Sequence, residues 1–117
     1  LIYRAIFNLV ENGVKYNRPG GSVCVAASRR GGEAVIEVAD TGCGISEAFR
    51  ESVFQPFFRV DKSRSREKGG VGLGLSLVWE IAHLHGGGVR VRESGAQGTA
   101  IELTLPANQR QPLASDA

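Results

Sequence analysis

Three polar residues lie close together in the first segment of the chain. Asn8, Asn12 and Lys15 belong to a stretch whose apolar residues recur every three to four positions, which is typical of a helix. At about 100° per residue, their side chains form a stripe roughly half a turn around the helix from Ile6. Carboxamide oxygens can bind Mg²⁺, which needs few protein ligands when phosphates supply the rest. The stripe could hold a metal and a phosphate, and a solvated helix face would show the same pattern.

A single carboxylate follows the second strand-like segment. Asp40 starts the glycine-rich turn DTGCGI, residues 40–45. An aspartate at such a place often only caps its own backbone. Taken alone, Asp40 favours that simpler interpretation. Gly42 and Gly44 would allow a close backbone approach, which a ligand could use.

A charged segment leads into a second glycine-rich stretch. Residues 54–72 begin with aromatic residues and show no sustained periodicity, which indicates a long loop of the kind that closes over active sites. The part from Arg59 to Lys68 has an excess of positive charge, which suits a triphosphate and equally an ordinary solvated loop. Glycines 70, 72 and 74 would let the N–H groups of the following helix approach phosphates. The stretch is not a P-loop, because it has no Gly-Lys-Ser/Thr ending.

Five segments occur together in a fixed order between residues 8 and 106: NLVENGVKY, DTGCGI, FQPFF, GVGLGLSLV and GTAIELTLP. In this order they resemble the N, G1, F, G2 and G3 boxes of the ATP-binding catalytic domains of bacterial sensor histidine kinases. The joint match is far more specific than any single box, since a glycine string alone would indicate only a generic phosphate loop.

The resemblance implies a site for ATP and Mg²⁺. It makes Asn12 the Mg²⁺ ligand, Asp40 the acceptor for the adenine amino group, and Asn8 and Lys15 the catalytic residues beside the phosphates. Phe54 and Phe57 would anchor the loop that follows them. The other residues expected to contact the nucleotide are Tyr16, Gly42, Gly44, Ile45, Arg59, Gly70, Val71, Gly72, Leu73, Gly74, Leu75 and Thr99.

The resemblance also implies a reaction and partners. The domain would transfer the γ-phosphate of ATP to a histidine on a separate dimerisation domain, from which a response regulator receives it, and the full-length protein would be a homodimer. His83 and His85 lie in the last turn of a predicted helix, where histidine complements the dipole, so neither is expected to be the acceptor. Three alternatives stay open: a related ATPase, a serine kinase, or a nucleotide-binding module without catalysis. Related ATPases carry a glutamate where this chain has Asn8, which argues against efficient hydrolysis.

The elements that must position these residues follow from periodicity and turn residues. The expected helices cover residues 1–16, about 46–53 and about 73–85, and the expected strands cover 22–28, 33–39, 88–94 and 99–106. Leu77, Ile81 and Leu84 should form the apolar side of the third helix. This order predicts an α+β fold, a two-layer sandwich with helices on one face of a mixed, mostly antiparallel sheet. The resemblance names it the Bergerat fold.

Composition fits one domain over residues 1–106, with 107–117 as a disordered tail. The strand that precedes the first helix in this family is expected to lie before residue 1. A net charge of +2 does not suggest nucleic-acid binding, and no apolar run is long enough to span a membrane. Cys24 and Cys43 make neither a disulfide framework nor a metal site. We expect a cytoplasmic domain, and an inner-membrane anchor elsewhere in the full-length protein is left open.

Overall fold

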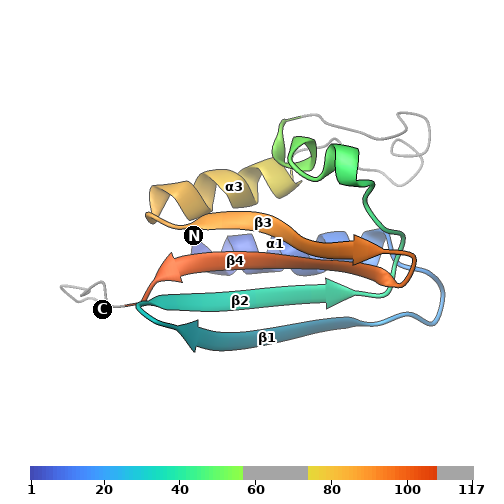
Figure 1. The fold of residues 1–117 in the computed structure, drawn as a ribbon, viewed down its shortest axis with the longest axis horizontal. Coiled ribbons are helices and arrows are strands. Elements are labelled where there is room, and N and C mark those ends of the chain that lie inside the picture. Colours follow the sequence, from blue (N-terminus) through green and yellow to red (C-terminus); the bar gives the residue numbers. More distant parts are fainter. Residues whose placement is uncertain (57–73, 108–117) are drawn as a thin grey trace.

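Four strands form one antiparallel sheet, and two helices cover one of its faces (Figure 1). The computed structural model describes residues 1–56 and 74–107. Its elements are helix α1 (Ile2–Lys15), strands β1 (Val23–Arg30) and β2 (Glu33–Asp40), the 3₁₀ turns η1 (Glu47–Phe49) and η2 (Ser52–Phe54), helix α3 (Gly74–Leu84), and strands β3 (Gly88–Gly95) and β4 (Gly98–Pro106). The predicted α+β sandwich is confirmed. The predicted tail lies outside the described residues, apart from its first residue, Ala107.

The sheet consists of two hairpins joined side by side in the order β1-β2-β4-β3. Strand β2 pairs with β4, and this pairing sets Asp40 opposite Thr99 and Glu37 opposite Glu102. Residues far apart in the sequence, at the end of β2 and the start of β4, therefore meet at one end of the sheet. In the described part of the chain every strand pair is antiparallel.

The hydrophobic core lies between the helices and the inner face of the sheet. Ala5 and Leu9 of α1 are almost fully buried, as are Val78 and Ile81 of α3. The core cluster also includes Val38, Phe54, Leu75, Ala82, Val91, Ile101 and Leu103. Phe54 is buried in this core, whereas Phe57 and the loop that both residues were expected to anchor lie outside the described residues.

The buried face of α3 differs from the predicted one. Ile81 is buried, but Leu77 is 43% exposed and Leu84 is 72% exposed. The helix buries Leu75, Val78 and Ala82 instead. Its sequence, GLSLVWEIAHL, is apolar almost all round, so periodicity alone could not select the face that packs on the sheet.

The helix predicted over residues 46–53 is also wrong. The chain forms two consecutive 3₁₀ turns there, η1 and η2. The predicted N-cap, Ser46, makes no side-chain capping bond, and its carbonyl accepts a hydrogen bond from the N–H of Phe49 at 2.8 Å. The segment is too short to build a cooperative α-helix, so three-residue turns satisfy its backbone locally.

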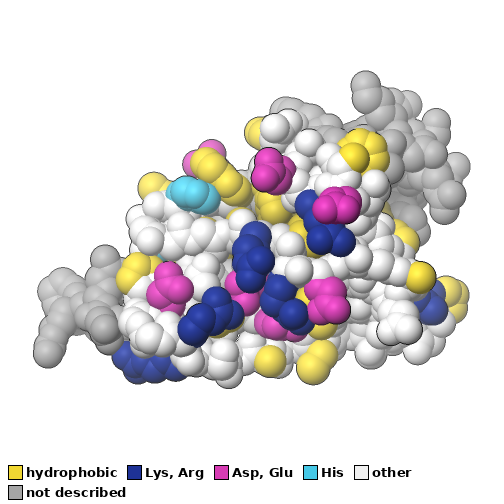
Figure 2. Space-filling view, viewed as in Figure 1, with side chains coloured by type: hydrophobic (Ala, Val, Ile, Leu, Met, Phe, Trp, Pro, Cys, Tyr) yellow, Lys and Arg dark blue, Asp and Glu magenta, His cyan; other side chains and the backbone are white. Residues whose placement is uncertain are grey.

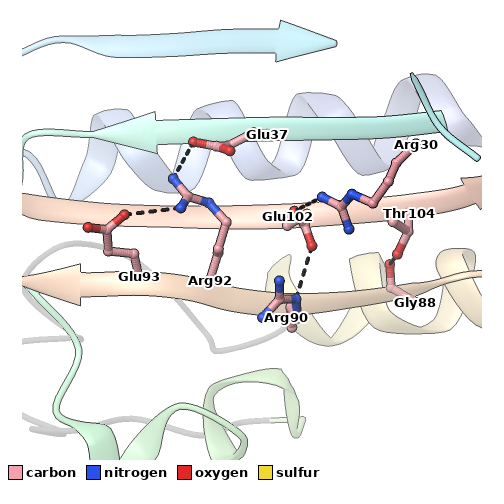
Figure 3. Close-up of polar contacts among 8 residues, drawn as sticks. All are labelled: Arg30, Glu37, Gly88, Arg90, Arg92, Glu93, Glu102 and Thr104. Atoms are coloured by element: carbon pink, nitrogen blue, oxygen red, sulfur yellow. Dashed lines mark hydrogen bonds and ion pairs between the residues drawn. The ribbon is translucent and has the colours of Figure 1, made fainter. Parts of the chain in front are cut away.

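The outer face of the sheet carries a network of charged side chains. Figure 2 shows blue and magenta side chains gathered over the strands, and Figure 3 shows how they pair. Glu102, only 3% exposed, lies between Arg30 at 2.7 Å and Arg90 at 3.0 Å. Arg92 contacts Glu37 at 2.8 Å and Glu93 at 3.2 Å. The hydrogen bond from Arg30, assisted by Arg90, holds the pKa of Glu102 below its ordinary value, and Glu37 raises the pKa of Arg92.

The described residues contain two α-helices, α1 and α3. Neither is long and apolar enough to span a bilayer.

Candidate functional site

The polar stripe of α1 faces the start of α3. Asn8 is buried, and its side-chain Nδ2 donates a hydrogen bond to the carbonyl oxygen of Gly74 at 3.4 Å. One turn further on, Asn12 and Lys15 are half-buried. Asn12 makes no side-chain hydrogen bond with another described residue. Its amide oxygen is therefore available to a ligand, while Asn8 links two of the sequence motifs.

Asp40 lies against the same helix at Gly13. A Cβ built on Gly13 would stand 3.4 Å from the Cβ of Asp40, so the absence of a side chain brings the helix close to the carboxylate. Oδ1 of Asp40 accepts hydrogen bonds from the N–H of Gly42 at 2.9 Å and of Thr99 at 3.3 Å. Oδ2 has no hydrogen-bond partner among the described residues. Asp40 thus caps its own loop with one oxygen and leaves the other free to accept a hydrogen bond.

The two glycines of the Asp40 loop, residues 40–45, are required by contacts inside the protein. A Cβ on Gly42 would collide with the carbonyl oxygen of Tyr16, and one on Gly44 would collide with that of Gly95. The loop therefore packs directly on the backbone of its neighbours. Whether it also approaches a base closely, as the sequence suggested, stays a prediction.

Ser94 and Thr99 hold the other end of the Asp40 loop. Thr99 is buried, and its hydroxyl lies 2.8 Å from that of Ser94 and 3.4 Å from the carbonyl oxygen of Cys43. The N–H of Ile45 donates to Oγ of Ser94 at 2.6 Å. Arg50 donates to the carbonyl oxygen of Ser94 at 3.0 Å. The Thr99 hydroxyl is thus engaged within the protein, where it positions the loop.

The structure describes the second glycine-rich stretch from Gly74 onward. Gly74 begins α3 and has open space around its Cα, and the side chain of Leu75 is part of the hydrophobic core. The remaining predicted residues of the stretch and of the charged loop lie outside the described residues: Arg59, Gly70, Val71, Gly72 and Leu73. Of this part of the predicted site, only the start of α3 can be placed.

Sequence reasoning missed several residues that support the site. Ser94, Arg18 and Thr41 make hydrogen bonds between loops that are distant in the sequence. Their signal was weak, because each is a common polar residue beside a turn. A correct prediction of the β3–β4 register would have placed Ser94 opposite Thr99 and so indicated its role.

The described surface includes a small cavity and a larger groove. The cavity, of about 350 Å³, lies beside the Asp40 loop and is lined by Arg18, Gly20, Gly21, Ser22, Thr41 and Gln97. The groove, of about 890 Å³, lies on another side, between α3, β3 and η2. The groove contains none of the predicted nucleotide-binding residues. The smaller cavity contains none of them either, and it adjoins the candidate site only through Thr41 of the Asp40 loop.

The fold and the meeting of these motifs indicate a class of ATPase domain. In this class, a helix that carries asparagine residues packs on an antiparallel sheet. Residues 1–109 match the family of histidine kinase-, DNA gyrase B- and HSP90-like ATPases, and the chain belongs to this family. Within the family its relatives are sensor histidine kinases, and the chain is a histidine kinase catalytic ATPase domain.

Similar proteins support this assignment in sequence and structure. The chain is 42% identical over 106 residues to the sensor-like histidine kinase SenX3 of Mycolicibacterium smegmatis, a match that covers 91% of the chain and 28% of SenX3. Among solved structures, the mycobacterial sensor histidine kinase MprB matches with a TM-score of 0.76 and 36% identity, over 88% of this chain and 68% of that one. Full-length ShkA in complex with AMPPNP matches with a TM-score of 0.78 and 31% identity, and the match covers 90% of this chain and 21% of that one.

Proposed function

We propose that this domain binds Mg²⁺·ATP and transfers the γ-phosphate to a histidine on a separate dimerisation domain of the same protein, in the cytoplasm. A response regulator then receives the phosphate. The domain spans 28% of the length of SenX3, so the rest of that relative lies outside the matched region.

The observation that carries this proposal is that α1 contacts two other motifs, one of which is hydrogen-bonded to a third. Asn8 contacts Gly74, Gly13 lies against Asp40, and Asp40 accepts a hydrogen bond from Thr99. A nucleotide lying along α1 could thus reach the free oxygen of Asp40 with its base and the start of α3 with its phosphates. N–H groups at a helix start favour negative charge.

Asn12 is the residue that fits Mg²⁺. Its side chain is half-buried, has no protein partner in the described part of the chain, and offers an uncharged oxygen. Three or more His, Cys, Asp or Glu side chains do not cluster anywhere in the described residues, so a metal cage made by the protein alone is not favoured there. When bound, Mg²⁺ neutralises charge on the phosphates.

We assign the other residues of the predicted site the following roles. Asp40 selects a base with an amino group, because a carbonyl in the same place would leave the carboxylate oxygen unpaired. Lys15 supplies a positive charge for the phosphates, and Asn8 holds the start of α3 against α1. Phosphoryl transfer needs positioning and charge neutralisation more than reactive groups, so few side chains suffice.

A transfer assay tests this proposal. The protein is mixed with its histidine-bearing domain and radiolabelled ATP, and the product is tested for acid-labile, base-stable phosphate. We expect such labelling on the partner domain. Nucleotide binding without any label would overturn the kinase function and favour a binding module, whereas rapid release of free phosphate would favour an ATPase. Acid-stable label on a serine would favour a serine kinase.

A further inference from the structure

Three loops meet at one end of the sheet, and one side chain is hydrogen-bonded to two of them. Arg18 lies in the loop of residues 17–22, between α1 and β1. Its Nε donates to the carbonyl oxygen of Thr41 at 2.5 Å, and its Nη2 donates to that of Ala96 at 3.0 Å. Arg18 thus ties the loop after α1 to the Asp40 loop and to the turn between β3 and β4.

The backbone around Arg18 is itself held in place by Asn17. Oδ1 of Asn17 accepts hydrogen bonds from the N–H of Arg18 at 2.8 Å and from the hydroxyl of Thr41 at 2.9 Å. Its Nδ2 donates to the carbonyl oxygen of Ser22 at 2.9 Å. The guanidinium therefore extends from a fixed point, beside the cavity of about 350 Å³ that Arg18 and Thr41 help to line.

The position of Thr41 makes this contact relevant to the site. Thr41 directly follows Asp40, whose Oδ1 is bound to Gly42 and Thr99. The peptide groups around Asp40 are consequently held from inside by the carboxylate and from outside by Arg18. Movement of Thr41 would turn the free oxygen Oδ2 away from a bound base.

We propose that Arg18 is a positioning residue for base recognition: it fixes the Asp40 loop so that Asp40 can distinguish an amino group from a carbonyl. This inference rests on the proposed function, because it assumes that Asp40 meets the base. A guanidinium suits the task, since its planar fork of donors can reach two carbonyl oxygens at once. A lysine ammonium lacks this planar fork of donors.

The test measures base selectivity in the intact protein. Affinities for ADP and GDP are determined by competition with a fluorescent ADP analogue for the wild type, Arg18→Ala, Arg18→Lys and Arg4→Ala. We expect Arg18→Ala to weaken ADP binding about three- to tenfold and to leave GDP binding nearly unchanged, so that selectivity falls by the same factor. Arg18→Lys should lie between the wild type and Arg18→Ala.

Arg4→Ala is the matched control. It also removes one positive charge, but Arg4 lies over the ring of Phe7 on α1, with its Cζ 5.4 Å from the ring centroid. It should not change ADP or GDP affinity. Thermal unfolding of each variant reports whether the fold is kept.

The outcomes separate this inference from the function on which it rests. Wild-type protein that binds neither nucleotide would overturn the proposed function itself. Wild-type protein that binds ADP, together with Arg18→Ala that binds ADP and GDP with unchanged affinities, would overturn the role of Arg18 alone. An equal loss of ADP and GDP affinity would also overturn it, because that result indicates general loosening instead of lost base recognition.

Discussion

Asp40 is the residue on which nucleotide selectivity should depend most directly. Replacing it with Asn keeps an oxygen for the N–H groups of Gly42 and Thr99, so the loop should persist. The amide nitrogen would then take the place of the free oxygen and face the base amino group with a second donor. We expect Asp40→Asn to weaken ADP binding by at least about tenfold. Calorimetric titration with ADP measures this, and an unchanged affinity would refute the assignment of Asp40.

Asn12 should affect the metal more than the base. Asn12→Ala removes an uncharged oxygen that no described side chain uses, so the fold should be kept. We expect ATP binding by the variant to lose most of its dependence on Mg²⁺, while binding in the presence of a chelator stays near that of the wild type. Titrations with and without Mg²⁺ measure the difference. A variant that still gains as much affinity from Mg²⁺ as the wild type would contradict the role of Asn12.

Among individual residues, those inside recognisable motifs could be predicted from the sequence. The pattern led to Asn8, Asp40 and Thr99, and the structure brings each into contact with another motif. It could not lead to Arg18 or Ser94, because their importance comes from contacts between separate loops. Such contacts depend on how the hairpins and α1 are placed together, and no local pattern encodes that placement.

Gly13 shows how a single helix position sets the distance between α1 and the sheet. A Cβ there would approach Cγ2 of Val23 to 3.2 Å, which is tight, but Val23 is half-buried at the start of edge strand β1 and can shift. We expect Gly13→Ala to raise the free energy of unfolding by roughly 0.5 kcal/mol, since alanine favours a helix by up to about 1 kcal/mol over glycine. Urea unfolding measures this. A lower stability would show that the contact with Val23 cannot relax.

Gly42→Ala provides the contrast. Its Cβ would collide with the carbonyl oxygen of Tyr16, a backbone atom that cannot move without displacing the end of α1. We expect a loss of roughly 2 kcal/mol or more, as for other overpacked sites. Urea unfolding of Gly42→Ala measures this loss. A stability equal to that of the wild type would contradict the close contact between Gly42 and the carbonyl oxygen of Tyr16.

Elements with a clear period were predictable, and uniformly apolar or short ones were not. The hairpins and α1 were predicted to within about two residues at each end, because alternation and glycine turns mark their limits. Helix α3 was found, but its buried face was misassigned, since an apolar residue occupies almost every side. The segment of η1 and η2 carries helix-like residues over too short a length to form an α-helix.

The stability of the whole molecule should depend on pH through Glu102. Arg30 and Arg90 lower the pKa of Glu102 in the folded protein. A lowered carboxyl pKa contributes stability that is fully present above the unfolded value of about 4.3 and is lost as pH falls through the folded value. We expect the free energy of unfolding to drop below about pH 4 in the wild type, and to drop less in Glu102→Gln. Glu33→Gln, which removes an exposed carboxylate, should follow the wild type.

Urea unfolding at several pH values between neutral and about 3 measures these curves. Parallel acid limbs for the wild type and Glu102→Gln would contradict the prediction. An equal effect of Glu33→Gln would assign the acid sensitivity to general charge repulsion.

The ion pairs on the outer face also join the two hairpins. Arg30 of β1 reaches Glu102 of β4, and Arg92 of β3 reaches Glu37 of β2, so both pairs cross the boundary between β2 and β4. A slip of two residues along that boundary would keep every side chain on its own face, so the alternation of inward and outward residues alone would not oppose it. It would, however, separate Arg30 from a buried carboxylate, which is costly. These ion pairs therefore favour the correct alignment of the hairpins, and with it the meeting of Asp40 and Thr99.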